Sequence, residues 1–245
     1  RTEQTRFGVR AAPAAVAAAA AANVTSKPIC IAIGVATRAR SARARVSELP
    51  LFSVLLPSIL SAVSATDTRF RFELHVGYDE DDPLWSKATK RARAARLVAE
   101  RTEGYPLALN LSAHAGMRGA PCWVWSALFG AACRGGCDYF YQLNDDLRLI
   151  TPDWPAEFTS SLASNPFLPN FGLTGPLDKN NKRLMTQSFA HCTHHDIFGL
   201  YYPKRFKNWY SDDWATQVYG KRNTFWRKDV ETMHALAHQG PRYQV

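Results

Sequence analysis

Tyr139-Phe-Tyr-Gln-Leu-Asn-Asp-Asp146 is the stretch of sequence around which the fold is organised. Four of its first five residues are aromatic or apolar, and this run predicts a buried strand over 139–143. Asn144, Asp145 and Asp146 follow at the end of that strand. Open α/β sheets bind ligands at the carboxyl ends of their strands, and carboxylate oxygens suit Mg²⁺ or Mn²⁺ together with substrate phosphates. A metal–phosphate site is therefore predicted here, and an Asx-capped turn is the plainer alternative.

Apolar runs and helical patterns alternate on both sides of this strand. Parallel strands are predicted over 29–35, 71–77 and 107–111. Helices are expected over 48–64, 84–101 and 122–134, with Pro57 kinking the first. This order predicts an α/β fold, a mixed but mainly parallel sheet flanked by helices in a single domain. The second half is less regular, with helices expected at 152–164 and from 208 to 219, and strands at 171–176 and 229–234.

Composition excludes several protein classes. The chain has 245 residues, of which 46% are hydrophobic and 21% charged, with a net charge of +9. These proportions rule out a wholly disordered chain, a collagen and a disulfide-dense miniprotein. Arginines cluster over 38–45 and 91–101 without interleaved aromatic residues, so no nucleic-acid partner is expected. The clusters are read as solvated surface, or as attraction for an anionic substrate such as a nucleotide diphosphate.

Residues 1–27 form an Ala-rich leader or linker, and the domain is expected over 28–245. The run over 11–22 is interpreted as a linker or loose helix, or alternatively as the end of a signal or anchor segment. Five cysteines leave at least one unpaired within the chain. A Cys133–Cys137 disulfide in an oxidising compartment and buried free thiols are both open, whereas this spacing does not fit a zinc knuckle.

An acidic–aromatic cluster spans Trp209-Tyr-Ser-Asp212-Asp213-Trp214. Aromatic faces at Trp209 and Trp214 can stack on a sugar ring. A carboxylate at Asp213 or Asp212 can accept a proton from an attacking hydroxyl. The structural alternative is an N-cap, in which Ser211 or Asp212 caps a helix.

Histidines offer two further interpretations. His191, His194 and His195 lie close together and admit a metal-dependent hydrolase, although no zinc motif supports it. His234 ends a predicted strand and is a candidate ligand for a metal held by Asp146. The acidic turn after strand 71–77, with Asp79 at its start, is a candidate contact for a nucleoside or an ordinary solvated turn.

The order of these features resembles nucleotide-sugar-dependent glycosyltransferases of the GT-A (Rossmann-like) fold. In that family an Asp-x-Asp motif holds the divalent ion and the donor diphosphate. This chain departs from the motif, since Asn144 stands at its first position and Asp146 at its last. The 209–214 segment is similar to the acceptor-binding and base-supplying segment of inverting members. His234 resembles a downstream histidine that completes the metal site.

The resemblance implies a donor half over 28–150 and an acceptor half over 151–245. It implies a metal-dependent hexosyltransferase that uses Mn²⁺ or Mg²⁺, a nucleoside-diphosphate sugar donor and a glycan or glycoprotein acceptor. It assigns the base to Asp213 or Asp212 and the metal to Asp146 with Asp145 or His234. It assigns donor binding to Asp79, Arg118, Asn144 and Asp145, and acceptor binding to Trp209 and Trp214. By analogy it implies the Golgi or secretory lumen, with a membrane anchor upstream. A retaining transferase and a non-catalytic sugar- or nucleotide-binding domain are the alternatives on the same fold.

Overall fold

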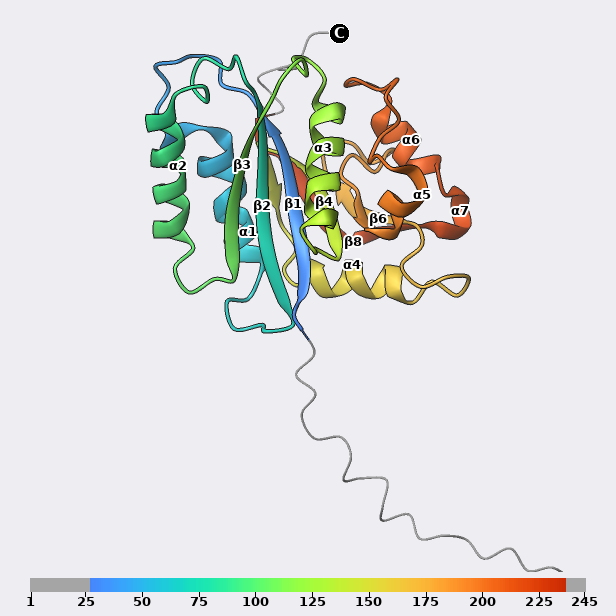
Figure 1. The fold of residues 1–245 in the computed structure, drawn as a ribbon. Helices are drawn as coiled ribbons and strands as arrows, with labels where there is room; N and C mark the ends of the chain where they lie inside the picture. Colours follow the sequence, from blue (N-terminus) through green and yellow to red (C-terminus); the bar gives the residue numbers. More distant parts are fainter. Residues whose placement is uncertain (1–26, 237–245) are drawn as a thin grey trace, which may run out of the picture.

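The structure is a computed structural model that describes residues 27–236. Its centre is an eight-stranded mixed sheet in the order β3-β2-β1-β4-β7-β6-β8-β5 (Figure 1). The strands are β1 Ile29–Thr37, β2 Phe70–Asp79, β3 Leu107–His114, β4 Tyr139–Asn144, β5 Leu147–Leu149, β6 Leu173–Asp178, β7 Phe189–His191 and β8 Thr224–His234. The α-helices are α1 Leu56–Ala62, α2 Ala88–Arg101, α3 Pro121–Arg134, α4 Trp154–Ala163, α5 Thr193–Phe198, α6 Ser211–Gln217 and α7 Gly220–Asn223.

Residues 1–26 of the expected leader, with their Ala-rich run, lie outside the described residues. Within 27–236 no helix combines the length and the apolar character that crossing a bilayer requires.

The first half of the sheet is parallel, as its apolar runs predict. β1 pairs with β2 on one side and with β4 on the other, both in parallel register. Alternate residues of β1 enter different cores, since Ile31 and Ile33 pack on one face and Cys30 and Ala32 on the other. Both faces are buried, which explains why the sequence shows a continuous apolar run and no alternation.

Helices cover the two faces of the sheet. The core on one face takes side chains from α1, α2 and α4, and the core on the other takes them from α3 and α6. Figure 1 shows α3 in front of the sheet and α1 behind it. The result is the three-layer α/β architecture that the sequence predicts.

The helix expected over 48–64 is divided into three parts. A 3-10 turn over Val46–Glu48 (η1) and a π turn over Leu51–Leu55 (η2) precede α1. Pro57 lies in the first turn of α1. Proline has no N–H to donate and its ring clashes with the preceding turn, and the wider π turn before it accommodates both effects.

The second half of the sheet contains elements that the sequence did not reveal. β7 pairs antiparallel with β4 and β6, and β5 pairs antiparallel with β8. β5 and β7 have three residues each, and α5 and α7 have six and four. Segments this short complete too few turns or alternations for periodicity to identify them.

The cysteines pair differently from the prediction. Disulfides join Cys30 to Cys137 and Cys133 to Cys192, and Cys122 is free and buried, as the odd count requires for one of the five. The Cys133–Cys137 bond, one of the two possibilities that the sequence left open, does not form, because a turn directs the two residues to different partners. Gly136 has a φ of 85° there, and the chain reverses from α3 into β4. Cys137 therefore meets β1, while Cys133 meets the segment before α5.

Candidate functional site

A cavity of about 520 Å³ opens at the carboxyl end of β4, between that strand, the end of β8 and the start of α6. Seven of the predicted site residues line it: Asn144, Asp145, Asp146, Trp209, Asp212, Asp213 and His234. The strand-end acids and the 212–213 acids, far apart in sequence, thus face a common space. Its volume lies within the range of roughly 300–1,000 Å³ that is typical of small-molecule sites.

The first wall of the cavity is the tight turn after β4. Asp145 is buried, and the Thr37 hydroxyl donates a hydrogen bond of 2.7 Å to its Oδ2. Asp146 is buried as well, and its backbone carbonyl accepts from the Ala235 amide at 3.0 Å. Strand β5 begins at the next residue and holds this turn against β8.

His234 reaches Asp146 because of strand register. In the antiparallel β5–β8 pair, His234 lies opposite Leu147, the residue after Asp146. Its Nδ1 is 3.3 Å from Asp146 Oδ1, and its Nε2 is 3.5 Å from Asp178 Oδ2. Asp178 ends β6 and is itself held by the Thr186 hydroxyl at 2.8 Å. One imidazole therefore lies between a carboxylate of the β4–β5 turn and a carboxylate at the end of β6.

This arrangement fits a divalent ion. Asp146 offers a carboxylate oxygen and His234 an adjacent imidazole nitrogen. Mg²⁺-type sites commonly use one or two protein carboxylates and leave other positions to phosphate oxygens. Ligating histidines usually have a polar partner on their other ring nitrogen, which fixes the ring. Here Nε2 of His234 lies 3.2 Å from the Gln187 amide nitrogen and 3.5 Å from the Asp178 carboxylate.

The second wall is the start of α6. Tyr210, immediately before it, adopts a left-handed φ of 68° and is 73% exposed. Burial raises the pKa of Asp212 to about 6. The negative charges of Asp213 and Asp178 add to this rise, and the Ser211 hydrogen bond and the nearby His234 oppose it. A carboxylate in this range is suited to accept a proton near neutral pH.

The structural alternative for this segment was an N-cap with tryptophans packed in the core; its N-cap is wrong, while Trp214 packs as it expects. The N-cap position belongs to Tyr210, and no side chain caps the helix. The Ser211 hydroxyl instead donates to the Asn208 carbonyl at 3.1 Å and to Asp212 Oδ1 at 3.2 Å. Asp212 and Asp213 therefore lie in the first turn, where a negative charge is favoured by the helix dipole.

The two tryptophans of the cluster have different surroundings. Trp209 is 50% exposed on the cavity wall, where its face is accessible to a ligand. Trp214 does not line that cavity. Its ring packs edge-on against those of Phe198 and Tyr202 and lines a separate shallow groove. The structure therefore brings Trp209, and not Trp214, to the site.

Two predicted donor residues lie outside the cavity. Asp79 ends β2, where burial raises its pKa and the nearby Arg38 opposes that shift. It lines a small recess with Thr37 and Gly119, adjacent to the β1 end. Arg118 is exposed, with its Nη1 3.5 Å from Asp81 Oδ2, and its charge opposes the rise in the pKa of Asp79, so it lies near that residue but does not line the cavity.

The three clustered histidines do not form a site. His194 is buried, with Nδ1 3.0 Å from the Tyr219 hydroxyl and Nε2 3.1 Å from the Tyr201 carbonyl. Burial lowers its pKa to about 4. His191 bonds to Thr193, and His195 packs against the Phe129 ring. Their ligand atoms do not converge among the described residues, so the hydrolase interpretation has no structural support.

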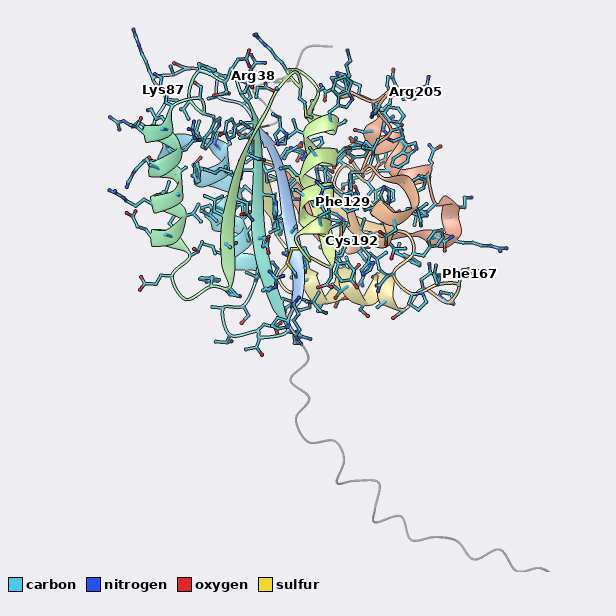
Figure 2. All side chains as sticks on the ribbon, in the orientation of Figure 1. Arg38, Lys87, Phe129, Phe167, Cys192 and Arg205 are labelled. Carbon is cyan, nitrogen blue, oxygen red and sulfur yellow. A yellow bond between two sulfur atoms is a disulfide. The ribbon has the colours of Figure 1, made fainter. Side chains whose placement is uncertain are left out.

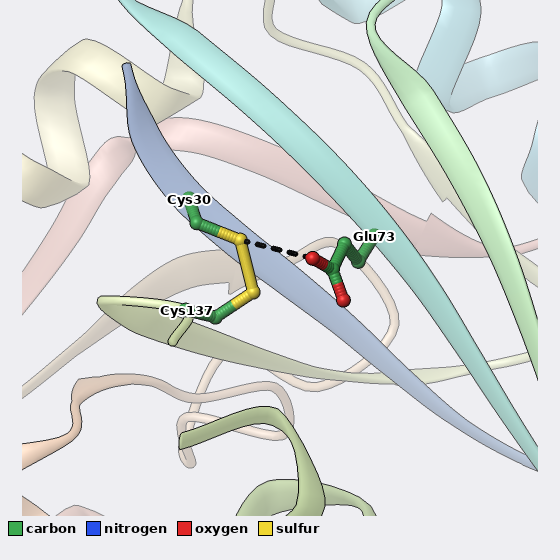
Figure 3. A group of neighbouring side chains, drawn as sticks. All are labelled: Cys30, Glu73 and Cys137. Carbon is green, nitrogen blue, oxygen red and sulfur yellow. Dashed lines mark hydrogen bonds between the residues drawn. A yellow bond between two sulfur atoms is a disulfide. The ribbon is translucent and has the colours of Figure 1, made fainter. Parts of the chain in front are cut away.

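One other group brings three candidate ligand atoms close together within 27–236 (Figure 3). It consists of Cys30, Cys137 and Glu73, and a disulfide joins the two cysteines. A sulfur committed to a disulfide is not a thiolate ligand. Glu73 instead pairs with Arg71 at 2.6 Å and with His75 at 3.0 Å, so this group is structural.

Sequence reasoning missed several residues of the site. Asp178 was not singled out, because the strand predicted at 171–176 ended before it, although it ends the observed strand β6 as Asp146 follows β4. Asp178 supports the site from behind, and Gln142 and Arg183 line the cavity. Gln142 lies within the apolar strand β4 and accepts a bond from the Tyr202 hydroxyl at 3.2 Å. A polar residue inside an otherwise apolar strand was the available signal for it.

Comparisons with known proteins support the fold of this chain but do not identify its family. No protein-family model matches the chain, and no curated protein matches its sequence. Among solved structures it is similar to TarS from S. aureus, with a TM-score of 0.51 and 10% identity. The match covers 84% of this chain and 36% of TarS, so the chain spans about a third of that protein. At this identity the likeness shows the fold alone, which matches that of a GT-A enzyme.

Proposed function

We propose that this protein is a glycosyltransferase that moves a sugar from a nucleoside-diphosphate sugar to an acceptor hydroxyl with the help of Mn²⁺ or Mg²⁺. A single observation carries the proposal. Asp146 with His234 and Asp212 with Asp213 line one cavity on a GT-A-like fold. Such a cavity has separate places for a leaving diphosphate and for a proton acceptor.

The β4 end would hold the donor. Asp146 and His234 would bind the divalent ion, which supplies positive charge that stabilises the leaving diphosphate. Gln187 and Asp178 contact the far nitrogen of His234 and so orient its ring, and the Thr37 hydroxyl orients Asp145. Asn144 offers an amide in place of the first carboxylate of the Asp-x-Asp motif, and an amide can hydrogen-bond a ribose hydroxyl.

The start of α6 would serve the acceptor. Asp212 accepts the proton of the attacking hydroxyl, and Trp209 provides a face on which a sugar ring can stack. Asp212 is preferred to Asp213 as the base because its pKa is raised to about 6. A base positioned across the cavity from the leaving group supports in-line attack with inversion, and an acceptor of glycan or glycoprotein type fits the aromatic wall.

The two disulfides are informative about the cellular compartment of the protein. Disulfides persist in oxidising compartments and are rare in the cytosol. The bonds Cys30–Cys137 and Cys133–Cys192 therefore support a secretory-pathway lumen, such as the Golgi, as the proposed location.

The test is a thermal-shift panel of nucleoside diphosphates with and without Mn²⁺. A ligand at about 100 times its Kd stabilises the folded state by about 2.7 kcal/mol, which corresponds to roughly 5–10 °C for a domain of this size. We expect one nucleotide to produce this shift only with Mn²⁺, and Asp146→Asn to abolish it. Asp196→Asn, exposed on α5, is the charge-matched control. A shift that persists without metal, or in Asp146→Asn, contradicts the metal assignment.

A non-catalytic binding domain is the second candidate, favoured by the amide at Asn144. A binding domain would show the same nucleotide-dependent thermal shifts but would form no glycosylated product. Incubation of the bound donor sugar with a glycan panel separates the two, because only a transferase releases nucleoside diphosphate in step with acceptor modification. The anomeric configuration of the product then distinguishes inversion from retention.

A further inference from the structure

A strongly basic face lies outside the lining of the acidic cavity. It is built from two segments, residues 38–48 after β1 and residues 87–101 around α2. Together they contain ten lysines and arginines and two glutamates, a net charge of +8, while the whole chain carries +9. Nearly all of the net charge of the protein is therefore concentrated in two short segments, which we call the basic face.

The fold brings these two segments together. η1 packs against α2, and the Lys90 ammonium donates to the Ala44 carbonyl at 2.9 Å. Figure 2 shows Arg38 and Lys87 at the same upper corner of the molecule, with Arg205 on the opposite side. Seven of the cations on the face are exposed: Arg40, Arg43, Arg45, Lys87, Arg93, Arg96 and Arg101.

The acids within the face do not neutralise it. Arg45 is 81% exposed and lies 3.5 Å from Glu48, and Arg93 lies 3.6 Å from Glu100. Exposed pairs at these distances are typically worth less than about 1 kcal/mol. Clustering so many like charges destabilises a folded protein unless a counter-charge binds, so the face is suited to a polyanion.

The chemistry of the face selects among polyanions. Every large apolar side chain that is exposed within 27–236 lies outside both segments. The face has no aromatic group to stack on nucleic-acid bases and no apolar group to insert into a bilayer. Anionic lipids are moreover concentrated on the cytoplasmic leaflet, whereas the two disulfides indicate an oxidising compartment. Arginine, which predominates here, binds carboxylate and similar planar or tetrahedral oxyanions with two parallel hydrogen bonds.

We propose that the basic face binds an acidic polysaccharide, a chain that carries carboxylate or sulfate groups, at a site separate from the cavity. This surface does not depend on the proposed transferase activity, since its binding is measured without a donor or turnover. If the protein is a transferase, the face would hold a charged acceptor polymer beside the sheet edge at which the cavity opens.

The experiment measures binding of the full chain to immobilised heparin and polygalacturonate across a salt series. The test variant is Arg40→Glu/Arg43→Glu/Arg93→Glu/Arg96→Glu. The control is Lys204→Glu/Arg205→Glu/Lys221→Glu/Arg222→Glu, which makes the same change in charge at exposed positions on the other side of the molecule. Circular dichroism verifies folding, and a set with glutamine in place of glutamate is used if the first does not fold.

We expect the test variant to lose at least about tenfold in affinity for both polysaccharides and the control to lose less than about threefold. The slope of log affinity against log salt should fall by about 3 in the test variant, since each neutralised charge on a polyanion contributes roughly 0.7–0.9. Equal losses in both variants, or no binding by the parent protein, overturn the proposal. Tighter binding to random duplex DNA or to phosphatidylserine vesicles than to either polysaccharide also overturns it.

Discussion

The two walls of the cavity use carboxylates in different ways. At the β4 end, Asp145 is held by Thr37, and Asp146 lies beside His234, in a two-residue turn between the strands β4 and β5. At the start of α6, Asp212 has few polar contacts, and burial raises its pKa to about 6. Neighbouring carboxylates in contrasting environments are how one site separates the binding of charge from the transfer of protons. The β4 wall is suited to the first role and the α6 wall to the second.

The largest expected effect tests the α6 wall. Asp212→Asn removes the proton acceptor while keeping the shape of the side chain. Turnover should fall by about 10²–10⁴-fold, the usual contribution of a general base, with donor binding unchanged. Steady-state kinetics and calorimetry of nucleotide binding measure the two quantities. Asp213→Asn, one residue along the same turn, should lose less than about tenfold, and a greater loss there would transfer the role of base to Asp213.

The next effect concerns α5, which supports the α6 wall through the contact of Phe198 with Trp214. The Cys133–Cys192 disulfide ties the segment before α5 to α3, whereas the turn of the β4 wall lies between two strands of the sheet. Replacing both cysteines by serine should lower the free energy of unfolding by about 2–4 kcal/mol. Urea denaturation measures it. Hydrogen exchange should accelerate in α5 more than in β4. Equal acceleration of hydrogen exchange in α5 and β4 would show that the disulfide does not stabilise α5 selectively.

A smaller effect tests the support of the β4 wall. Asp178 contacts the far nitrogen of His234 and does not line the cavity itself. Asp178→Asn should weaken Mn²⁺-dependent nucleotide binding by about 10–100-fold, the usual effect of losing a carboxylate that orients a metal ligand. Calorimetric titration with Mn²⁺ measures this. Unchanged metal affinity with normal folding would remove Asp178 from the site.

The smallest effect is a pH dependence. Because Asp212 must be ionised to accept a proton, turnover should fall about tenfold for each pH unit below its pKa of about 6. Its folded pKa lies above the ordinary 3.8, so ionising it costs stability. That cost appears as the pH rises from about 4 to about 6. Asp212→Asn should therefore lose less stability over this interval, as measured by thermal unfolding at each pH. An identical pH profile in the variant would contradict the raised pKa.

Sequence reasoning identified the elements of the first half closely because their signals are local. The strands at 29–35, 71–77, 107–111 and 139–143 were each predicted from one apolar run, and each lies within an observed strand. The short elements β5, β7, α5 and α7 were missed, because three to six residues carry no measurable period. Their positions depend on pairing with distant strands.

Local signals identified some of the cavity residues but could not show which side chains point into the cavity. Asp146, His234, Asp212 and Trp209 were found because each stands at the end of an element or inside a polar–aromatic cluster. Arg118 and Trp214 were placed at the site on the same kind of reasoning, but the fold brings neither to the cavity. The direction in which a side chain points is set by neighbours from other parts of the chain, which no local pattern describes.

By itself the sequence determined the α/β class, the parallel first half of the sheet and the polar group at the end of strand 139–143, because apolar periodicity and strand-end chemistry are properties of short segments. Only the tertiary structure decided that the 212–213 acids face that strand end, that His234 lies between Asp146 and Asp178, that Cys30 pairs with Cys137, and that two arginine segments form one face. These are contacts between residues far apart along the chain. They depend on strand order and on how helices pack over the sheet. The same local sequence patterns are compatible with many strand orders and packings, so they do not determine these contacts.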